Sequence, residues 1–325
     1  LYYNYFFKKR DSKYRDQIKQ TTKELDDINL NSDKAKHVLF EIKSIEYIVH
    51  SDLDSHHEIR KQQLKNLINS SVFEAEHLLR LMVLSNVFTK LKSQALVNEL
   101  KAYLIFMETC FKPVLQGDSD SVFMEKYYDI YFSNQSFIQT WLPNQEQLKK
   151  LLEQFKFVIS KGYLSNPILT GRIYLSLIEL QIIVENYKET TPLLTNFFSL
   201  SKKKKYSKHY IAGDLLFLLE NYLQGKMDTF DNAIESVNRK IRRNEIELDQ
   251  DQKTLLELLN DLYKSVAKDA QTYIDRISNK QTYKLFIYML TSTKSVTEIR
   301  AKHFPINDAD YDADRDTFLI SLAKY

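Results

Sequence analysis

The sequence predicts an all-α protein, and two observations carry that prediction. The 325 residues contain only five glycines and five prolines, whereas β-sandwiches and nucleotide-binding α/β folds need many more glycines in turns and phosphate loops. Apolar residues recur with helical spacing along nearly the whole chain, and the alternation typical of strands is almost absent. With 43% apolar residues, the chain can bury a sizeable core.

The N-terminal region, residues 1–113, is expected to form a helical bundle. A charged helix is expected over 10–28, and an amphipathic helix over 33–50 has Val38, Ile42, Ile45 and Val49 on one face. Two further helices begin at the capping boxes Ser55 with Glu58 and Ser71 with Glu74. A fifth helix runs from about Ser93 to Phe111 and ends near Pro113.

A second region, residues 114–280, begins with a Gly/Ser/Asp-rich candidate linker over 114–122 and an aromatic-rich segment over 122–140. Further helices are expected over 145–161, 168–186, from Thr191 with Pro192 at its first position, 208–224, 228–243, and from Asp249 to about Lys268.

The second region also contains a repeat. The turns at Asn186 and Gly225 are 39 residues apart, and each leads into a helix with a similar apolar pattern. Residues about 145–270 therefore resemble tetratricopeptide-like (TPR-like) helical repeats, with the helix around Phe230, Ala233 and Ile234 as the packing helix. The resemblance implies antiparallel helical hairpins stacked as an irregular TPR-like solenoid, and a groove that binds a peptide or partner protein.

The C-terminal segment, residues 281–325, differs from the preceding region because three short helices are expected in it. A short apolar helix, a Ser295/Glu298 capping box and a helix that begins near Asp316 follow one another. This order is similar to the helical part of winged-helix regulators. The alternative is an element that caps the repeat array.

The charge balance and the single cysteine restrict the function classes. The net charge is +3, from 46 basic and 43 acidic residues, which indicates a mixed solvated surface rather than a polyanion-binding body. Cys110 forms no intrachain disulfide, and its place in an apolar helix indicates a buried small residue rather than a nucleophile. A reducing, cytoplasmic location is expected; the alternative is a protein that does not need disulfides for stability.

The first residues allow a further interpretation. An aromatic stretch over 1–7 runs into Lys8, Lys9 and Arg10, as at the cytoplasmic exit of a membrane helix. The alternative is a short aromatic helix that packs on the core, because no stretch approaches the ~18 apolar residues of a membrane span. A membrane tether before Leu1 is one interpretation of this pattern.

Motifs for catalysis, cofactors and metals are not evident, so no enzyme activity is predicted. The sequence contains neither of the glycine patterns that bind phosphate groups, Gly-x-x-x-x-Gly-Lys and Gly-x-Gly-x-x-Gly. His56 and His57, near His50, Asp52 and Asp54, suggest a metal site, but a capped, exposed helix start is the preferred interpretation. The aspartates over 307–316 lack the glycine and glutamate of a calcium loop and indicate an acidic loop.

The chain has two basic clusters, Lys202–Lys205 and Arg239–Arg243. The first is interpreted as solvated lysines and the second as a charged helix terminus, and the alternative is that they contact phosphates.

The predicted function is a non-catalytic scaffold that binds a protein or peptide. The alternative is a regulator in which the array senses a partner and the C-terminal unit contacts DNA. The candidate partner-binding residues are Tyr127, Tyr128, Tyr131, Tyr174, Tyr210, Arg239, Arg242 and Arg243.

Overall fold

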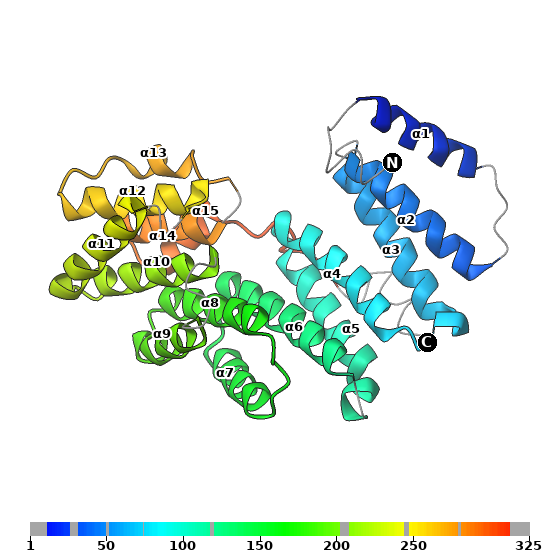
Figure 1. Ribbon diagram of the computed structural model, residues 1–325, viewed down its shortest axis with the longest axis horizontal. Helices are drawn as coiled ribbons and strands as arrows, with labels where there is room; N and C mark the ends of the chain where they lie inside the picture. The colour runs from blue at the N-terminus through cyan, green and yellow to red at the C-terminus, as the bar shows by residue number, and fades with distance from the viewer. Residues whose placement is uncertain are drawn as a thin grey trace. The chain divides into compact units, whose positions relative to one another are not determined.

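The computed structural model describes residues 12–26, 32–49, 52–73, 75–117, 120–201, 208–243, 247–278 and 281–312. Every regular element in these ranges is a helix, and none of them contains a strand (Figure 1). The predicted all-α class is confirmed. The aromatic N-terminal segment, the lysine run 202–205 and the expected helix after Asp316 lie outside the described residues.

The chain forms two compact units. Unit 1 contains the described residues up to Tyr127 together with 306–312, and unit 2 contains Tyr128 to Pro305. The division falls inside one helix, α6 (Ser121–Trp141), whereas the sequence predicts boundaries after residues 113 and 280.

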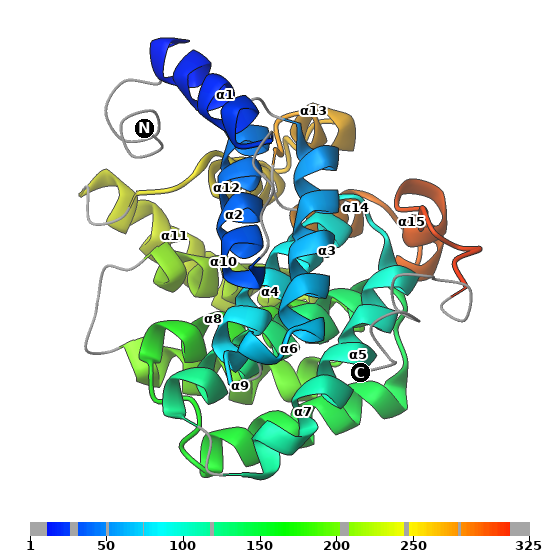
Figure 2. The same ribbon diagram turned by 90° about the vertical axis from the view of Figure 1, so that its right-hand side faces the viewer.

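Unit 1 is a succession of helices in which each packs against the next. Its core consists of side chains with at most 1% exposure, among them Leu64, Leu81, Val87, Leu100, Tyr103 and Phe111. The helices, which Figure 2 shows from a second direction, are α1 (Ser12–Asp26), α2 (Asp33–Val49), α3 (Leu53–Asn69), α4 (His77–Ser93) and α5 (Val97–Gln116).

Several expected helix ends in unit 1 are wrong. Helix α3 begins before Ser55, because the Asp52 carboxylate accepts the Ser55 amide at 3.0 Å and supplies the N-cap. Ser71 begins a 3₁₀ turn that ends at Phe73, so α4 starts several residues later than expected. Helix α5 continues past Pro113 and ends at Gln116.

The expected apolar face of α2 is only partly buried. Val38 is 55% exposed, and a polar network forms part of the contact with α3. Arg60 donates to Glu41 at 2.7 Å and to Gln63 at 2.6 Å. Gln63 in turn donates to Glu41 at 2.6 Å. These bonds satisfy polar groups that would otherwise be costly to bury, so polar as well as apolar side chains join α2 to α3.

The N-terminus of α5 is capped from a distant part of the chain. Leu96, at the N-cap position, provides no side-chain hydrogen bond. The Asp308 carboxylate accepts the amides of Val97 at 2.9 Å and Glu99 at 2.7 Å. A negative charge at a helix N-terminus is favourable, since the first amides have no partner within the helix. This residue of the expected acidic loop therefore has a structural role.

Unit 2 continues with α7 to α15 (Figure 1). Helices α8 and α9 pack as a pair, as do α10 and α11, and the first helices of successive pairs also touch, α8 with α10 and α10 with α12. The helices are α7 (Gln145–Ser160), α8 (Pro167–Ile183), α9 (Tyr187–Ser201), α10 (Lys208–Leu223), α11 (Met227–Arg242), α12 (Gln250–Tyr263), α13 (Ala270–Ile274), α14 (Gln281–Thr291) and α15 (Val296–His303).

Three turns in unit 2 recur with a period of 40 residues. Glu185, Gly225 and Ser265, which follow α8, α10 and α12, all have positive φ, from 57° to 67°. In each turn the next amide donates to the carbonyl five residues back at 2.8 to 2.9 Å, which is a Schellman helix end. Buried apolar residues share the period: Ile178, Leu218 and Leu258; Leu194, Ile234 and Ile274; Phe197, Val237 and Ile277.

Helix α9 begins earlier than expected. It starts at Tyr187, directly after the turn at Glu185, and Pro192 lies inside it. The Thr191 hydroxyl donates to Glu220 on α10 at 3.0 Å and does not cap a helix. The turn, and not the Thr-Pro pair, determines the start, because the Schellman bonds already direct the chain into the next helix.

Phe197 on α9 fits between two glycines on neighbouring helices. A Cβ atom added to Gly171 on α8 would lie 3.5 Å from Cε2 of the Phe197 ring, an ordinary contact. A Cβ atom added to Gly213 on α10 would lie 2.3 Å from Cε1 of the same ring. Gly213 therefore allows the close approach of α9 and α10.

The C-terminal helices pack on the rest of unit 2. Helix α15 begins with the expected capping box at Ser295 and Glu298. The Phe304 ring lies 5.4 Å from the Trp141 ring and 6.0 Å from the Tyr288 ring, centroid to centroid. These contacts tie the end of unit 2 to α6 and α14.

Candidate functional site

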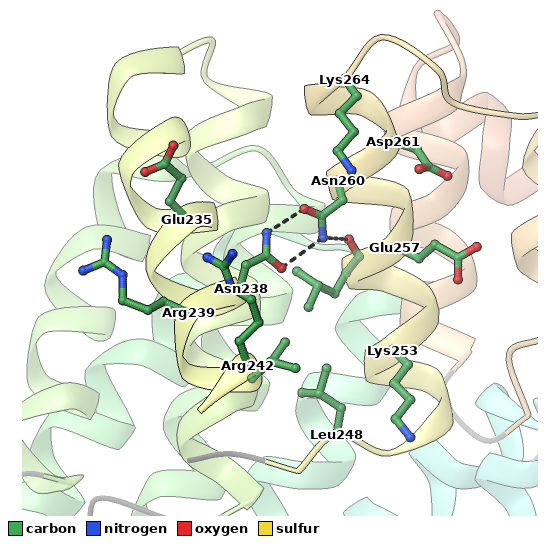
Figure 3. A pocket seen from close by; sticks show the side chains of 12 residues that line it. Glu235, Asn238, Arg239, Arg242, Leu248, Lys253, Glu257, Asn260, Asp261 and Lys264 are labelled. Atoms are coloured by element: carbon green, nitrogen blue, oxygen red, sulfur yellow. Dashed lines mark hydrogen bonds between the residues drawn. The ribbon is translucent and has the colours of Figure 1, made fainter. Parts of the chain in front are cut away.

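A groove with a volume of about 730 Å³ lies between α11 and α12 (Figure 3). Its size is within the range of ligand-binding pockets, although it is open along one side. The lining residues come from both helices and the end of their connection: Glu235, Asn238, Arg239, Ile241, Arg242, Leu248, Lys253, Leu256, Glu257, Asn260, Asp261 and Lys264.

The local sequence explains how both walls are positioned. Helix α11 is strongly amphipathic, with Phe230, Ile234 and Val237 buried on one side, so its polar residues are left on the other. Helix α12 begins where expected, at a capping box in which the Asp249 carboxylate accepts the Gln252 amide at 2.8 Å. Each helix thus presents a polar stripe to the groove.

The two walls are joined by a pair of asparagines. Asn238 on α11 donates to the side-chain oxygen of Asn260 on α12 at 2.7 Å, and Asn260 donates back at 3.4 Å (Figure 3). Asn260 also donates to the Leu256 carbonyl at 3.0 Å. A carboxamide has two N–H donors and two acceptor lone pairs, so the pair retains capacity for further hydrogen bonds.

The acidic residues of α12 are engaged on the side away from α11. Glu257 accepts two hydrogen bonds from Arg276 at 2.8 and 2.7 Å, and the Arg276 guanidinium holds the pKa of Glu257 below its usual value. Asp261 accepts the Tyr273 hydroxyl at 2.7 Å. In Figure 3 both carboxylates point away from α11. Their charges are therefore turned toward α13.

The basic residues of the groove have no such partners within the described part of the chain. None of Arg239, Arg242, Lys253 and Lys264 forms an ion pair with a residue that the structure describes. Arg242 and Lys264 extend toward the asparagine pair, from α11 and α12 respectively (Figure 3). Since Glu257 and Asp261 are bonded elsewhere, the groove presents four basic side chains and the carboxylate of Glu235.

Two of the predicted partner-binding residues, Arg239 and Arg242, line this groove, and Arg243 is exposed at the end of α11. Tyr210 is half-buried, with the Lys240 ammonium 5.2 Å from the centre of its ring. Lys240 also forms an ion pair with Asp214 at 2.7 Å. These residues lie on the second hairpin of the 40-residue series.

The other four predicted residues are buried tyrosines: Tyr127, Tyr128, Tyr131 and Tyr174. Their rings pack on other aromatic rings. For example, the Tyr174 ring lies 4.8 Å from the Phe155 ring, edge to face. A buried ring is not presented to a partner, so these four side chains contribute to packing.

The prediction missed every other residue that lines the groove, among them Asn238, Lys253, Asn260 and Lys264. A signal for them is present in the sequence. Lys253, Glu257, Asn260 and Lys264 are spaced by four, three and four residues, which places them on one face of a helix. Such a stripe resembles any solvated face, and only the position of α11 beside it makes it the wall of a groove.

The histidine cluster at the start of α3 is more buried than expected. His57 is 8% exposed, and burial lowers its pKa to about 4. Burial also lowers the pKa of His56. Among the residues that the structure describes, which omit His50, no group of three or more histidine, cysteine or acidic side chains could hold a metal ion.

Cys110 is only half-buried, and burial raises the pKa of its thiol. A raised pKa keeps the thiol protonated near neutral pH and lowers its reactivity.

Comparison of the chain with family models, curated protein sequences and solved structures gives no significant match. Among the described helices, none combines the length and apolar character needed to cross a membrane.

Proposed function

We propose that this chain is a non-catalytic helical-repeat scaffold that binds a protein or peptide partner in the cytoplasm. The observation that carries the proposal is the 40-residue recurrence of Schellman turns at Glu185, Gly225 and Ser265. Together with the packing of α8 on α10 and α10 on α12, it supports a TPR-like stack of hairpins. Such stacks present extended surfaces, and binding is their usual use.

The groove between α11 and α12 supports the same proposal. It is open along one side, and both walls carry polar groups whose hydrogen-bonding capacity is not exhausted. An open groove can hold an extended peptide segment that continues beyond both ends of the groove, whereas small-molecule sites are usually more enclosed.

The test is affinity capture from the lysate of cells that make the protein, with and without nuclease, followed by reconstitution with the purified partner. A stoichiometric protein that survives nuclease treatment and binds in calorimetry is the expected result. The proposal would be overturned if no protein is captured at stoichiometric levels. Capture that disappears after nuclease treatment would favour the regulator that contacts DNA.

A further inference from the structure

The groove between α11 and α12 has a charge distribution that selects its occupant. Glu257 and Asp261 are bonded to Arg276 and Tyr273 on the far side of α12. Arg242 and Lys264 extend to the asparagine pair from opposite walls (Figure 3). Carboxylate groups of an occupant would form charge-assisted hydrogen bonds with both cations, and such bonds are stronger than neutral ones.

The floor and rim of the groove favour a peptide over a nucleic acid. Asn238 and Asn260 offer donors and acceptors that match the amide groups of a peptide backbone. Leu248 and Leu256 add apolar surface beside them. Glu235 also lines the groove, and its carboxylate repels a continuous row of phosphates but tolerates a peptide whose charges are spaced apart.

On the basis of the proposed function, we infer that the groove between α11 and α12 binds an acidic segment of the partner protein. Its carboxylates pair with Arg242 and Lys264, and its backbone amides meet the asparagine pair. The TPR-like resemblance alone implies a groove but does not say between which helices it lies or which charge it accepts.

The experiment measures fluorescence anisotropy of the full chain with a labelled glutamate peptide of about ten residues, in which glutamate alternates with neutral residues, and with a peptide of equal length in which glutamine replaces each glutamate, at low salt. The glutamate peptide is expected to bind at least about tenfold more tightly. The variant Arg242→Glu/Lys264→Glu is expected to weaken binding of the glutamate peptide by at least about tenfold.

The matched control is Lys149→Glu/Lys188→Glu, which changes the net charge equally at exposed positions on α7 and α9. It is expected to change the affinity by less than about threefold. If both variants lose affinity for the glutamate peptide equally, the peptide binds through the overall charge of the protein, and the inference is overturned. The milder variant Arg242→Gln/Lys264→Gln, with unfolding followed by circular dichroism, shows whether the first variant fails only because it is misfolded.

The outcomes separate this inference from the proposed function. If the glutamate peptide does not bind but the captured partner binds the groove variant and the wild type equally, the scaffold function stands and the groove assignment is wrong. If a DNA duplex binds more tightly than the peptide and is lost in the groove variant, the groove recognises phosphates and both proposals fail.

Discussion

Replacement of Gly213 by alanine tests whether Phe197 limits the approach of α9 and α10. The new Cβ atom would lie 2.3 Å from Cε1 and 2.9 Å from Cδ1 of the ring, whereas carbon atoms are best placed about 3.5 to 4.0 Å apart. The ring must therefore move by about 1 Å. It has little space to do so, because Phe197 is 2% exposed and its other edge faces Gly171.

The expected net effect is a destabilisation of about 2 kcal/mol. Overpacking of a tight core costs about 1 to 3 kcal/mol, and the crowding on both sides of the ring places this site at the upper end. Replacement of glycine by alanine within a helix stabilises the helix by about 1 kcal/mol, which offsets part of this cost. For a unit of this size, the midpoint of thermal unfolding should fall by about 4 to 8 °C.

The assay is urea unfolding followed by the fluorescence of Trp141, the single tryptophan of the chain, which lies in unit 2. Gly171→Ala is the matched control, since its Cβ atom makes an ordinary contact at 3.5 Å. It should stabilise unit 2 by about 1 kcal/mol. The two substitutions should thus have opposite signs although both replace a helical glycine beside the same ring.

A double variant measures the contact directly. Phe197→Leu removes the ring edge that the new Cβ atom meets, so Gly213→Ala should cost at least about 1 kcal/mol less in its presence. The reasoning is refuted if Gly213→Ala stabilises unit 2 as much as Gly171→Ala does, because the ring then has room to move.

Three further results are expected. Asp308→Ala should lower the free energy of unfolding by about 1 to 2 kcal/mol through loss of the α5 cap, whereas alanine at the exposed Asp310 should not change it in the same denaturant titration. Neutral His57 is favoured in the fold, with a pKa near 4 against 6.5; its stabilisation is present above pH 6.5 and is lost as the pH falls toward 4. Between about pH 7.5 and about pH 5, unfolding followed by circular dichroism should show His57→Gln losing about 2 kcal/mol less than the wild type. Phe230→Ala should cost about 3 to 5 kcal/mol because it leaves a cavity in a fully buried site, while alanine at Met227, which is 42% exposed, should cost much less in the same titration; similar losses would mean that Phe230 is not a core residue.

Local signals in the sequence were sufficient for the fold class and several helix ends. The helix start at Asp249, the capping box at Ser295 and the turn at Gly225 are present where expected. Each depends on residues within about one or two turns of helix, so a short window contains the whole interaction. The spacing of apolar residues is equally local, which is why the all-α class could be predicted.

The tertiary structure decided the features that depend on partners far apart in the sequence. Asp308 caps α5 across more than 200 residues, and Glu185 and Ser265 adopt positive φ without being glycine, so the full 40-residue period was not visible from glycines alone. Four of the five predicted tyrosines became core residues, and Lys264 became a groove residue, only through the helices packed beside them. Sequence patterns determine which residues share a helix face. Long-range packing determines which other helix lies against that face, and this decides whether the face belongs to the core, the surface or a binding site.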